Sequence, residues 1–402
     1  MSIQTMNRTV SPFSSRVLDV DESLTVATFA RMGELKRRGA DLISLVAGEP
    51  DFDTPANVKK AAIEAINKGC TKYTAPASGL PELRQAIARK LKRENNLDYD
   101  PSQIVVTCGA KQVIFDAVVA LINPGDEAII PSPFWVSYAD QVRLMGGRPV
   151  ILKTSGETGF RLTPRALANA ITPRTKIILL NSPCNPTGEV YTHGELGALG
   201  DVIADAGIFV ISDEIYEKII YEPARHVSIA AVHPGAGCRT LIVNGFSKAY
   251  AMTGWRVGYG AGPPELMRLI AKVQSQETTN TCTISQYAAI EALTGTQERV
   301  ETMRAAFRER RDLIVARLNR LPGVTCRLPQ GAFYAFPNVS GLYGERVRND
   351  VELTDYLLEE AMTGCVPGSG FGSGDHLRFS YAASLPTIHE AMDRIEDAVS
   401  RI

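Results

Sequence analysis

The sequence predicts an α/β fold in which a mainly parallel sheet is flanked by helices, together with a smaller α+β domain. After a polar arm of about twenty residues, short apolar runs rich in β-branched residues alternate with stretches of helical periodicity. The runs at 104–107, 176–180 and 208–212 are apolar almost throughout, which is typical of strands buried on both faces of a parallel sheet. Each run ends in polar residues or glycine. Because open α/β sheets bind ligands at the carboxyl ends of their strands, we expect a functional site there.

The remaining elements follow in order along the chain. A further apolar run at 241–244 predicts a strand, and 291–318 predicts a helix with Arg and Glu on its polar side. From about residue 321 the pattern changes, and shorter pieces alternate: strands at 331–336 and 376–381, helices at 351–362 and 388–398.

This change of pattern suggests three segments. We expect a large domain at 53–297 and a small C-terminal domain at 298–402, with residues 1–52 forming an N-terminal arm and part of the small domain.

The composition is that of a folded globular protein without an excess of either charge. The chain has 402 residues, of which 45% are hydrophobic and 22% charged, and 43 Lys and Arg face 44 Asp and Glu. Such a balance provides no basic field to attract phosphates, so we expect neither nucleic acid nor an anionic membrane surface as a partner.

Several classes of protein are disfavoured by what the sequence lacks. No apolar run approaches the roughly 18 residues of a spanning helix, and residues 1–8 lack the apolar core of a secretory signal, so we expect a cytoplasmic protein. Seven dispersed cysteines, an odd number with no close pair, argue against a disulfide framework. The five histidines lack metal-ligand spacing, so we expect no metal.

The first chemical motif is a turn from a strand into a helix. The run at 104–107 passes through Gly109 into a helix that begins near Ala110 and Lys111. The N-terminus of such a helix attracts a phosphate, because unpaired backbone N–H groups and the positive end of the helix dipole point the same way. The same turn is also ordinary α/β architecture.

The second motif is a carboxylate, Asp213, at the end of the apolar run 208–212. A charge in such a position requires a cationic partner. The alternative is that Asp213 caps a following helix.

The third motif is Lys248, just past the strand at 241–244, with Arg256 eight residues later among glycines. Loss of hydration and a neighbouring cation both lower the pKa of an amine, which then becomes a nucleophile toward carbonyl groups. A phosphate cradle, a carboxylate for a pyridinium nitrogen and a lysine for a Schiff base are the groups that pyridoxal phosphate requires.

With these motifs in view, the chain resembles the class I, fold-type I aminotransferases that depend on pyridoxal phosphate, and in particular the bacterial aspartate aminotransferase branch. The resemblance runs from about residue 44 to residue 381 and implies a seven-stranded type of central sheet. Seven ordered segments carry it: SLVAGEPDF at 44–52, KY at 72–73, NSPCNPTG at 181–188, SDEIY at 212–216, SK at 247–248, GWR at 254–256 and RFSY at 378–381.

The resemblance implies a role for each matching residue. Lys248 would bind the cofactor covalently and then move the proton of the substrate, and Asp213 would pair with the pyridine nitrogen. Asn185 and Tyr216 would donate to the phenolic oxygen of the cofactor, and Trp135 would stack on its ring.

The phosphate of the cofactor would be held by several groups from this subunit and one from a second. Lys111 is implied as a further cofactor-binding residue, and the phosphate-binding residues implied are Gly109, Ala110, Ser247, Arg256 and, from the second subunit, Tyr73. A homodimer with active sites at the subunit interface follows from the last of these.

The resemblance also implies how the substrate is held. Arg378 would bind its α-carboxylate in a planar two-pronged pair, near the backbone of Gly48 and beside Trp135 and Asn185. No arginine occupies 278–281, the segment that carries a second carboxylate-binding arginine in some relatives. In the bacterial branch the side-chain carboxylate of the substrate is bound instead by a lysine at the position of Lys111 and by hydroxyl groups at the positions of Ser23 and Thr25.

We therefore expect a transaminase for L-aspartate or a similar amino acid and 2-oxoglutarate. Asp21 occupies the position at which some relatives with prephenate activity carry a basic residue, and this difference argues against prephenate as a substrate. Other amino donors (alanine, aromatic amino acids, prephenate or arogenate) remain open within the same family. A pyridoxal lyase or decarboxylase would keep Lys248 and Asp213, although Arg378 favours transamination. A non-enzymatic alternative is a cofactor-binding regulator fused to a DNA-binding module. The arm before Ser44 is too short for such a module.

A serine hydrolase is the distant alternative, since residues 245–249 are one residue from a G-x-S-x-G elbow around Ser247. His376 and Asp375 lie downstream and would complete a triad.

Overall fold

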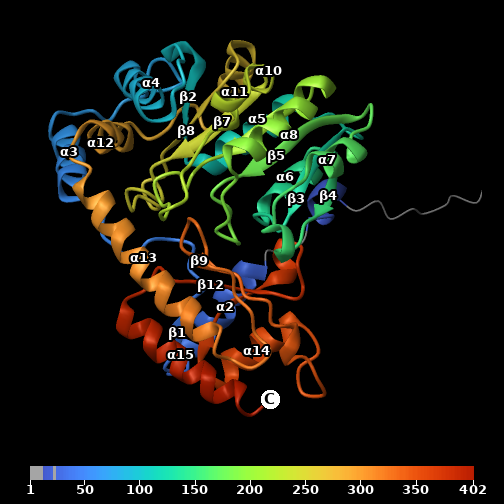
Figure 1. The fold of residues 1–402 in the computed structure, drawn as a ribbon. Coiled ribbons are helices and arrows are strands. Elements are labelled where there is room, and N and C mark those ends of the chain that lie inside the picture. The colour runs from blue at the N-terminus through green and yellow to red at the C-terminus, as the bar shows by residue number, and fades with distance from the viewer. Residues whose placement is uncertain (1–11, 21–23) are drawn as a thin grey trace, which may run out of the picture.

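The computed structural model describes residues 12–20 and 24–402. Its larger part is built on a seven-stranded sheet, and the smaller part, below it in Figure 1, holds sheets of two and three strands within the described ranges. In spatial order the large sheet runs β2 (Ile104–Thr107), β8 (Gly258–Ala261), β7 (Thr240–Gly245), β6 (Phe209–Asp213), β5 (Thr175–Asn181), β3 (Glu127–Ser132) and β4 (Arg148–Lys153).

This sheet confirms the predicted fold class. Strand β8 is antiparallel to β2 and to β7, and the other neighbouring strands pair in parallel. The register aligns the last residues of β5 and β6, so that Asn181 lies opposite Asp213. Because the β2–β8–β7–β6–β5 order brings the ends of distant segments to one edge, side chains that follow these strands converge.

Helices cover both faces of the large sheet. One face packs against α5 (Ala110–Leu121), α6 (Ser137–Leu144) and α11 (Pro264–Glu277). The other packs against α7 (Pro164–Ala170), α8 (His193–Ala206), α9 (Ile229–Val232) and α10 (Pro234–Gly237). The rest of that face, over β2, β7 and β8, is covered by α3 (Ala56–Asn67), α4 (Pro81–Asn95) and α12 (Thr283–Thr294).

The smaller part combines both ends of the described chain. Strand β1 (Ile43–Ser44) pairs in parallel with β10 (Thr363–Gly364). A second, antiparallel sheet has the order β11 (Val366–Pro367), β12 (Leu377–Ser380) and β9 (Tyr334–Ala335). Around them lie α2 (Leu24–Arg37), α13 (Glu298–Leu318), α14 (Asp350–Glu360) and α15 (Leu385–Val399). One hydrophobic cluster joins β1, β9, β12, α13, α14 and α15 through side chains such as Phe307, Phe333 and Phe379, and a second cluster contains Met32 of α2 and Val366 of β11.

Short elements complete the inventory. They are α1 (Ser15–Leu18) and the 3-10 helices η1 (Pro101–Gln103), η2 (Gly156–Thr158), η3 (Ser340–Leu342) and η4 (Gly368–Phe371). Among the described residues no helix has the length and apolar character needed to cross a membrane.

The segment 291–318 is largely helical, as predicted, but it is divided between two helices. Helix α12 ends at Thr294 and α13 begins at Glu298. Gly295 between them is extended, and a Cβ on it would lie 2.3 Å from the Glu291 carboxylate, which accepts a hydrogen bond from Asn57. The break lets α13 leave the sheet and run down the left of Figure 1 into the smaller part.

Candidate active site

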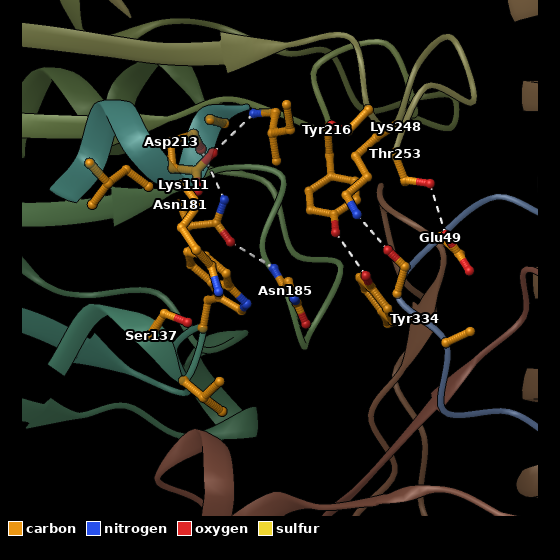
Figure 2. Close-up of a pocket in the computed structure, with 18 of the residues that line it drawn as sticks. Glu49, Lys111, Ser137, Asn181, Asn185, Asp213, Tyr216, Lys248, Thr253 and Tyr334 are labelled. Atoms are coloured by element: carbon orange, nitrogen blue, oxygen red, sulfur yellow. Dashed lines mark hydrogen bonds between the residues drawn. The ribbon is translucent and has the colours of Figure 1, made fainter. Parts of the chain in front are cut away.

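A cavity of about 460 Å³ opens at the carboxyl ends of the strands of the large sheet. Its floor comes from residues that follow β2, β3, β5, β6 and β7, and its other wall comes from the smaller part, including Gly48, Tyr334 and Arg378. The volume is within the range of small-molecule and cofactor sites, and this is the edge at which an open α/β sheet binds ligands. Figure 2 shows polar side chains pointing into this space from several segments.

The cavity gathers most of the residues that the sequence singled out. Those that line it are Gly48, Ala110, Lys111, Trp135, Asn185, Asp213, Tyr216, Ser247, Lys248, Arg256 and Arg378. Gly109 lies directly behind, in contact with Arg256.

The start of α5 forms a tight cradle. Gly109 has φ +82°, and a Cβ on it would lie 2.6 Å from Nη2 of Arg256. A Cβ on Gly258 would lie 2.5 Å from the backbone nitrogen of Ala110. Arg256 is fixed by two hydrogen bonds, from Nη1 to the Thr253 carbonyl (2.9 Å) and from Nη2 to the Cys108 carbonyl (3.3 Å). A guanidinium is thus held against a helix N-terminus, an arrangement that binds anions.

Asp213 is buried at the last position of β6. The Tyr138 hydroxyl donates to its Oδ2 (2.7 Å), and the backbone N–H of Ile215 donates to its Oδ1 (3.2 Å). Burial raises the pKa of Asp213 to about 6, while these two donors act to lower it. No helix follows Asp213: residues 215–218 form turns, and through the N–H of Ile215 Asp213 caps this turn instead.

Lys248 lies in the same cavity, and its amine donates a hydrogen bond to the carbonyl oxygen of Gly48 (Figure 2). Burial lowers the pKa of Lys248 to about 8, and the positive charges of Arg378 and Arg256 act in the same direction. The carboxylate of Glu49 opposes this effect. An amine with such a pKa is partly neutral near pH 7 to 8 and can act as a nucleophile or a base.

Tyr216 and Asn185 lie on either side of the cavity. The hydroxyl of Tyr216 shares a hydrogen bond of 2.7 Å with that of Tyr334, and both rings are buried. The Asn185 side-chain oxygen accepts from Nη1 of Arg378 (3.0 Å), and its backbone N–H donates to the side chain of Asn181 (2.7 Å). Since a guanidinium only donates, the amide NH₂ of Asn185 is left to serve an acceptor in the cavity.

Arg378 is clamped between aromatic rings. Its guanidinium carbon lies 4.6 Å from the centre of the Tyr334 ring and 4.9 Å from that of Phe371. Nη2 donates to the Val46 carbonyl (2.8 Å), whereas the buried Nε has no hydrogen-bond partner among the described residues. Orphaned buried donors are rare, and a planar guanidinium with donor capacity to spare suits a carboxylate.

Comparison with known proteins gives this geometry a family. The model of the family described as aminotransferase class I and II matches residues 40–395. The chain belongs to the class I and II aminotransferases. The predicted resemblance is thereby confirmed.

Individual relatives of this aminotransferase match over almost their whole length. An aspartate/prephenate aminotransferase of Cereibacter sphaeroides is 49% identical, over 95% of this chain and 97% of the relative, and an aspartate aminotransferase of Geobacillus stearothermophilus is 48% identical with the same coverage. The solved aspartate aminotransferase of Rhizobium meliloti superposes with a TM-score of 0.94 at 45% identity, over 97% of this chain and 99% of that one. The structure of the Thermus thermophilus enzyme with maleate gives 0.92 at 44%, over 97% and 100%.

Membership of the family settles the general chemistry. Such enzymes depend in general on pyridoxal phosphate and act on small amino and 2-oxo acids. The predicted aminotransferase activity is confirmed at this level.

Three further predicted site residues are absent from the described lining of the cavity, one because it lies elsewhere and two because the structure does not describe their side chains. Tyr73 is 84% exposed and lies outside it. Ser23 lies outside the described residues, and of Thr25, in α2, only the backbone is described.

Other cavity residues were missed by the sequence analysis. They are Phe29, Ala47, Glu49, Ile114, Val136, Ser137, Asn181, Ile215, Thr253, Tyr334 and Phe371. Glu49 accepts a hydrogen bond from Thr253 across the mouth (2.8 Å). Asn181 is the first residue of the 181–188 segment that also contains Asn185, and this position at a strand end was the available signal for it.

The aminotransferase site does not contain the triad of the hydrolase alternative. Ser247 lines the cavity, whereas His376 stacks on Phe336 (ring centres 4.8 Å apart) in a separate groove and bonds Ser373. Ser247 and His376 therefore do not form the serine–histidine pair that this alternative requires.

One group of possible metal ligands occurs in the described part of the chain. Ligand atoms of Glu214, Glu217 and His226 all lie within 4.8 Å of one another, behind the site. Lys90 is bonded to Glu217, and His226 to Glu214 (3.0 Å), so these carboxylates already have cationic or donor partners. The arrangement is that of a buried ionic network.

Proposed function

We propose that this aminotransferase uses pyridoxal phosphate to exchange the amino group between L-aspartate, or a similar amino acid, and 2-oxoglutarate. The observation that carries the proposal is the meeting of Lys248, Asp213 and the clamped Arg378 in one cavity. A nucleophilic amine, a buried carboxylate and a carboxylate-binding guanidinium supply what transamination requires of a protein.

The residues present fit the cofactor. The cradle of Gly109 and Ala110, with Arg256 and Ser247, would hold its phosphate, and the space that a Cβ would fill at Gly109 is taken by Arg256. Asp213 would pair with the pyridine nitrogen.

The remaining contacts with the cofactor would come from two hydrogen-bond donors and one aromatic ring. Tyr216 and the amide NH₂ of Asn185 would serve the phenolic oxygen, and Trp135 would stack on the ring. The sequence analysis also placed Lys111 among the cofactor residues. Its amine lies 4.8 Å from the centre of the Trp135 ring.

When bound, the cofactor supplies an electron sink for the charge that develops on the substrate Cα as its proton leaves. The chain's own residues do the rest. Arg378 orients the substrate by its α-carboxylate, with the backbone of Gly48 beside it. Lys248 takes the proton from Cα and returns it, since a pKa of about 8 leaves the amine close to balance between its two forms.

For the side chain of the substrate we propose Lys111, with Ser23 and Thr25. Burial and the charge of Arg256 lower the pKa of Lys111, so a distal carboxylate would stabilise its ammonium form. This assignment favours dicarboxylic substrates, in agreement with the names of the relatives, aspartate aminotransferases among them.

We also propose a homodimer in which Tyr73 completes the phosphate site of the other subunit. Its exposed ring is free to reach a second copy. Inactive Tyr73→Ala and Lys248→Ala enzymes, mixed under conditions of subunit exchange, should regain activity, because one site of each hybrid has both residues intact. A mixture that stays inactive although hybrids form contradicts the proposal.

We further propose that residues 53–297 and 298–402 act as two domains, with residues 1–52 joining the second, and that the second closes on bound substrate. The cavity walls contributed by Gly48 and Arg378 on one side and by Lys248 on the other support this division. Small-angle scattering that is identical with and without a dicarboxylate inhibitor would count against closure.

The visible absorption spectrum, before and after L-aspartate is added without a 2-oxo acid, tests the function. We expect a band of lysine-bound cofactor that is replaced by the shorter-wavelength band of its amine form. A band that responds to alanine, an aromatic amino acid or arogenate but not to aspartate would reassign the donor. A protein that takes up no pyridoxal phosphate would overturn the proposal.

A further inference from the structure

Tyr138 stands directly behind the candidate site without lining it. The residue belongs to the first turn of α6, three positions after Trp135, and its side chain is 2% exposed. Its hydroxyl is 2.7 Å from Oδ2 of Asp213, and none of the motifs in the sequence included it.

The direction of this hydrogen bond follows from chemistry. Burial raises the pKa of Tyr138 well above its ordinary value, so the phenol keeps its proton at neutral pH. An ionised carboxylate only accepts, and therefore Tyr138 donates. With the N–H of Ile215 on Oδ1, each oxygen of Asp213 has one donor, which fixes the plane of the carboxylate. Figure 2 shows Asp213 at the cavity wall.

The ring of Tyr138 has a second contact. It meets the indole of Trp135 edge to face, with centres 5.3 Å apart and planes at 83°. One side chain thus supports both a carboxylate and an aromatic wall of the cavity. Replacement by phenylalanine keeps the ring contact and removes only the hydroxyl, which makes the two roles separable.

We propose that Tyr138 is a positioning residue, whose hydroxyl holds the Asp213 carboxylate charged and oriented for the pyridine nitrogen of the cofactor. This inference rests on the proposed cofactor role of Asp213. Removing a hydrogen bond to a buried charge leaves that charge less stable, so the carboxylate of a Tyr138→Phe enzyme takes up a proton more readily.

The test is the affinity of the apoenzyme for pyridoxal phosphate and the pH dependence of the visible band without substrate. We expect Tyr138→Phe to bind the cofactor about 10–100-fold more weakly, the loss typical of a charge-assisted hydrogen bond, with a displaced spectral midpoint. It should lower kcat more than it changes KM. Tyr356→Phe is the matched control, because it loses a hydrogen bond to the Ala398 carbonyl (2.9 Å) far from the cavity.

A double-mutant cycle separates positioning from packing. In an Asp213→Asn background, Tyr138→Phe should have little further effect on cofactor affinity, because its partner charge is gone. Equal losses in both backgrounds, or an unchanged affinity and spectrum in the single variant, would overturn the inference while the wild-type band still supports the proposed function. A wild-type protein that binds no cofactor would overturn both. Circular dichroism of each apoenzyme checks that the fold is intact.

Discussion

The amine of Lys248 donates a hydrogen bond to the backbone carbonyl oxygen of Gly48, joining residues 200 positions apart in the chain. Lys248 follows a central strand of the large sheet, and Gly48 follows β1 of the smaller part. The amine is therefore held at the boundary between the two parts, where burial and neighbouring cations keep its pKa low.

The apoenzyme amine of Lys248 should react with carbonyl compounds at a lower pH than ordinary lysines do. Since its pKa is about 8, the rate should rise through pH 8 and then level off, whereas exposed lysines continue to gain reactivity to about pH 10.5. Reductive trapping of pyridoxal phosphate followed by mass spectrometry would measure this profile. Lys248→Ala should lose the trapped adduct and about 10²–10⁴-fold or more of its activity. A rate that still climbs steeply above pH 9.5 would contradict the assignment.

Arg378→Lys should lower kcat/KM for amino acid substrates by about 10–150-fold, the loss of a charge-assisted pair. Lysine keeps the charge but cannot span the Tyr334 and Phe371 rings or present two parallel donors. Arg311→Lys is the control, because Arg311 is also buried and stacks on a tyrosine, Tyr221 (4.6 Å), outside the cavity. Steady-state kinetics decide the matter, and similar losses in both variants would indicate a structural role only.

Lys111→Met should reduce kcat/KM for aspartate about tenfold or more while leaving that for alanine nearly unchanged. Methionine retains most of the apolar stem beside Trp135, and only the charge that would meet a distal carboxylate is lost. The ratio of the two kcat/KM values is the measurement. If both substrates suffer equally, Lys111 serves the cofactor rather than substrate choice.

Gly109→Ala should weaken pyridoxal phosphate binding about tenfold or more. The added Cβ would press on Arg256 at 2.6 Å, and alanine is strained at a φ of +82°. Gly125→Ala tests the strain alone, since Gly125 has φ +87° and nothing within 4 Å of the added Cβ. Equilibrium dialysis of the cofactor should separate the two variants. Equal affinities for the cofactor would show that the space at Gly109 is not part of the phosphate site.

Asp116→Asn should stabilise the protein, and more so as the pH rises. Asp116 is fully buried in α5, and its carboxyl lacks a hydrogen-bond partner among the described residues. Burial, together with the neighbouring Glu277 carboxylate, raises its pKa to about 8. In the unfolded chain the same group ionises near pH 4, so the contribution of Asp116 to wild-type stability falls between about pH 4 and 8.

The expected gain for Asp116→Asn is about 1–3 kcal/mol at pH 8 and little at pH 4. Urea unfolding of the holoenzyme at both pH values would measure it. Asp98→Asn, which removes an exposed carboxylate paired with Lys92, should change stability by less than about 0.5 kcal/mol. A gain for Asp116→Asn that does not depend on pH would contradict the titration of this carboxyl.

Much of the fold was predictable because buried parallel strands leave an unmistakable apolar pattern. The predicted run at 104–107 coincides with β2, and those around Asp213 and Lys248 lead to the observed strand ends. The break at Gly295 was not predicted, and the side chains that surround it, Glu291 and the distant Asn57, are brought together only in the folded chain.

Residues that line the cavity were predictable where the proposed chemistry requires particular residue types at fixed spacing, as for Lys248 and Asp213. The places of Tyr334 and Tyr138 in and beside the site were not predicted, because their contacts form only when distant segments pack together. The register of β9 with β12 places Tyr334 opposite Ser380, two residues from Arg378. The apolar pattern around Tyr334 does not indicate which strand it pairs with. From the sequence, Tyr138 is likewise expected to be an ordinary core aromatic residue, because its contact with Asp213 exists only in the folded sheet.

The parallel pairing of β1 with β10 has a consequence for biosynthesis. Ile43 emerges from the ribosome about 320 residues before its partner Thr363, an interval of about 16–64 s at usual translation rates. All strands of the large sheet have been synthesised by then, whereas the segment with Arg378, which lies near Gly48 in the folded protein, has not. The cradle of Gly109, Ala110 and Arg256 is therefore synthesised well before Arg378, which forms the opposite wall of the cavity.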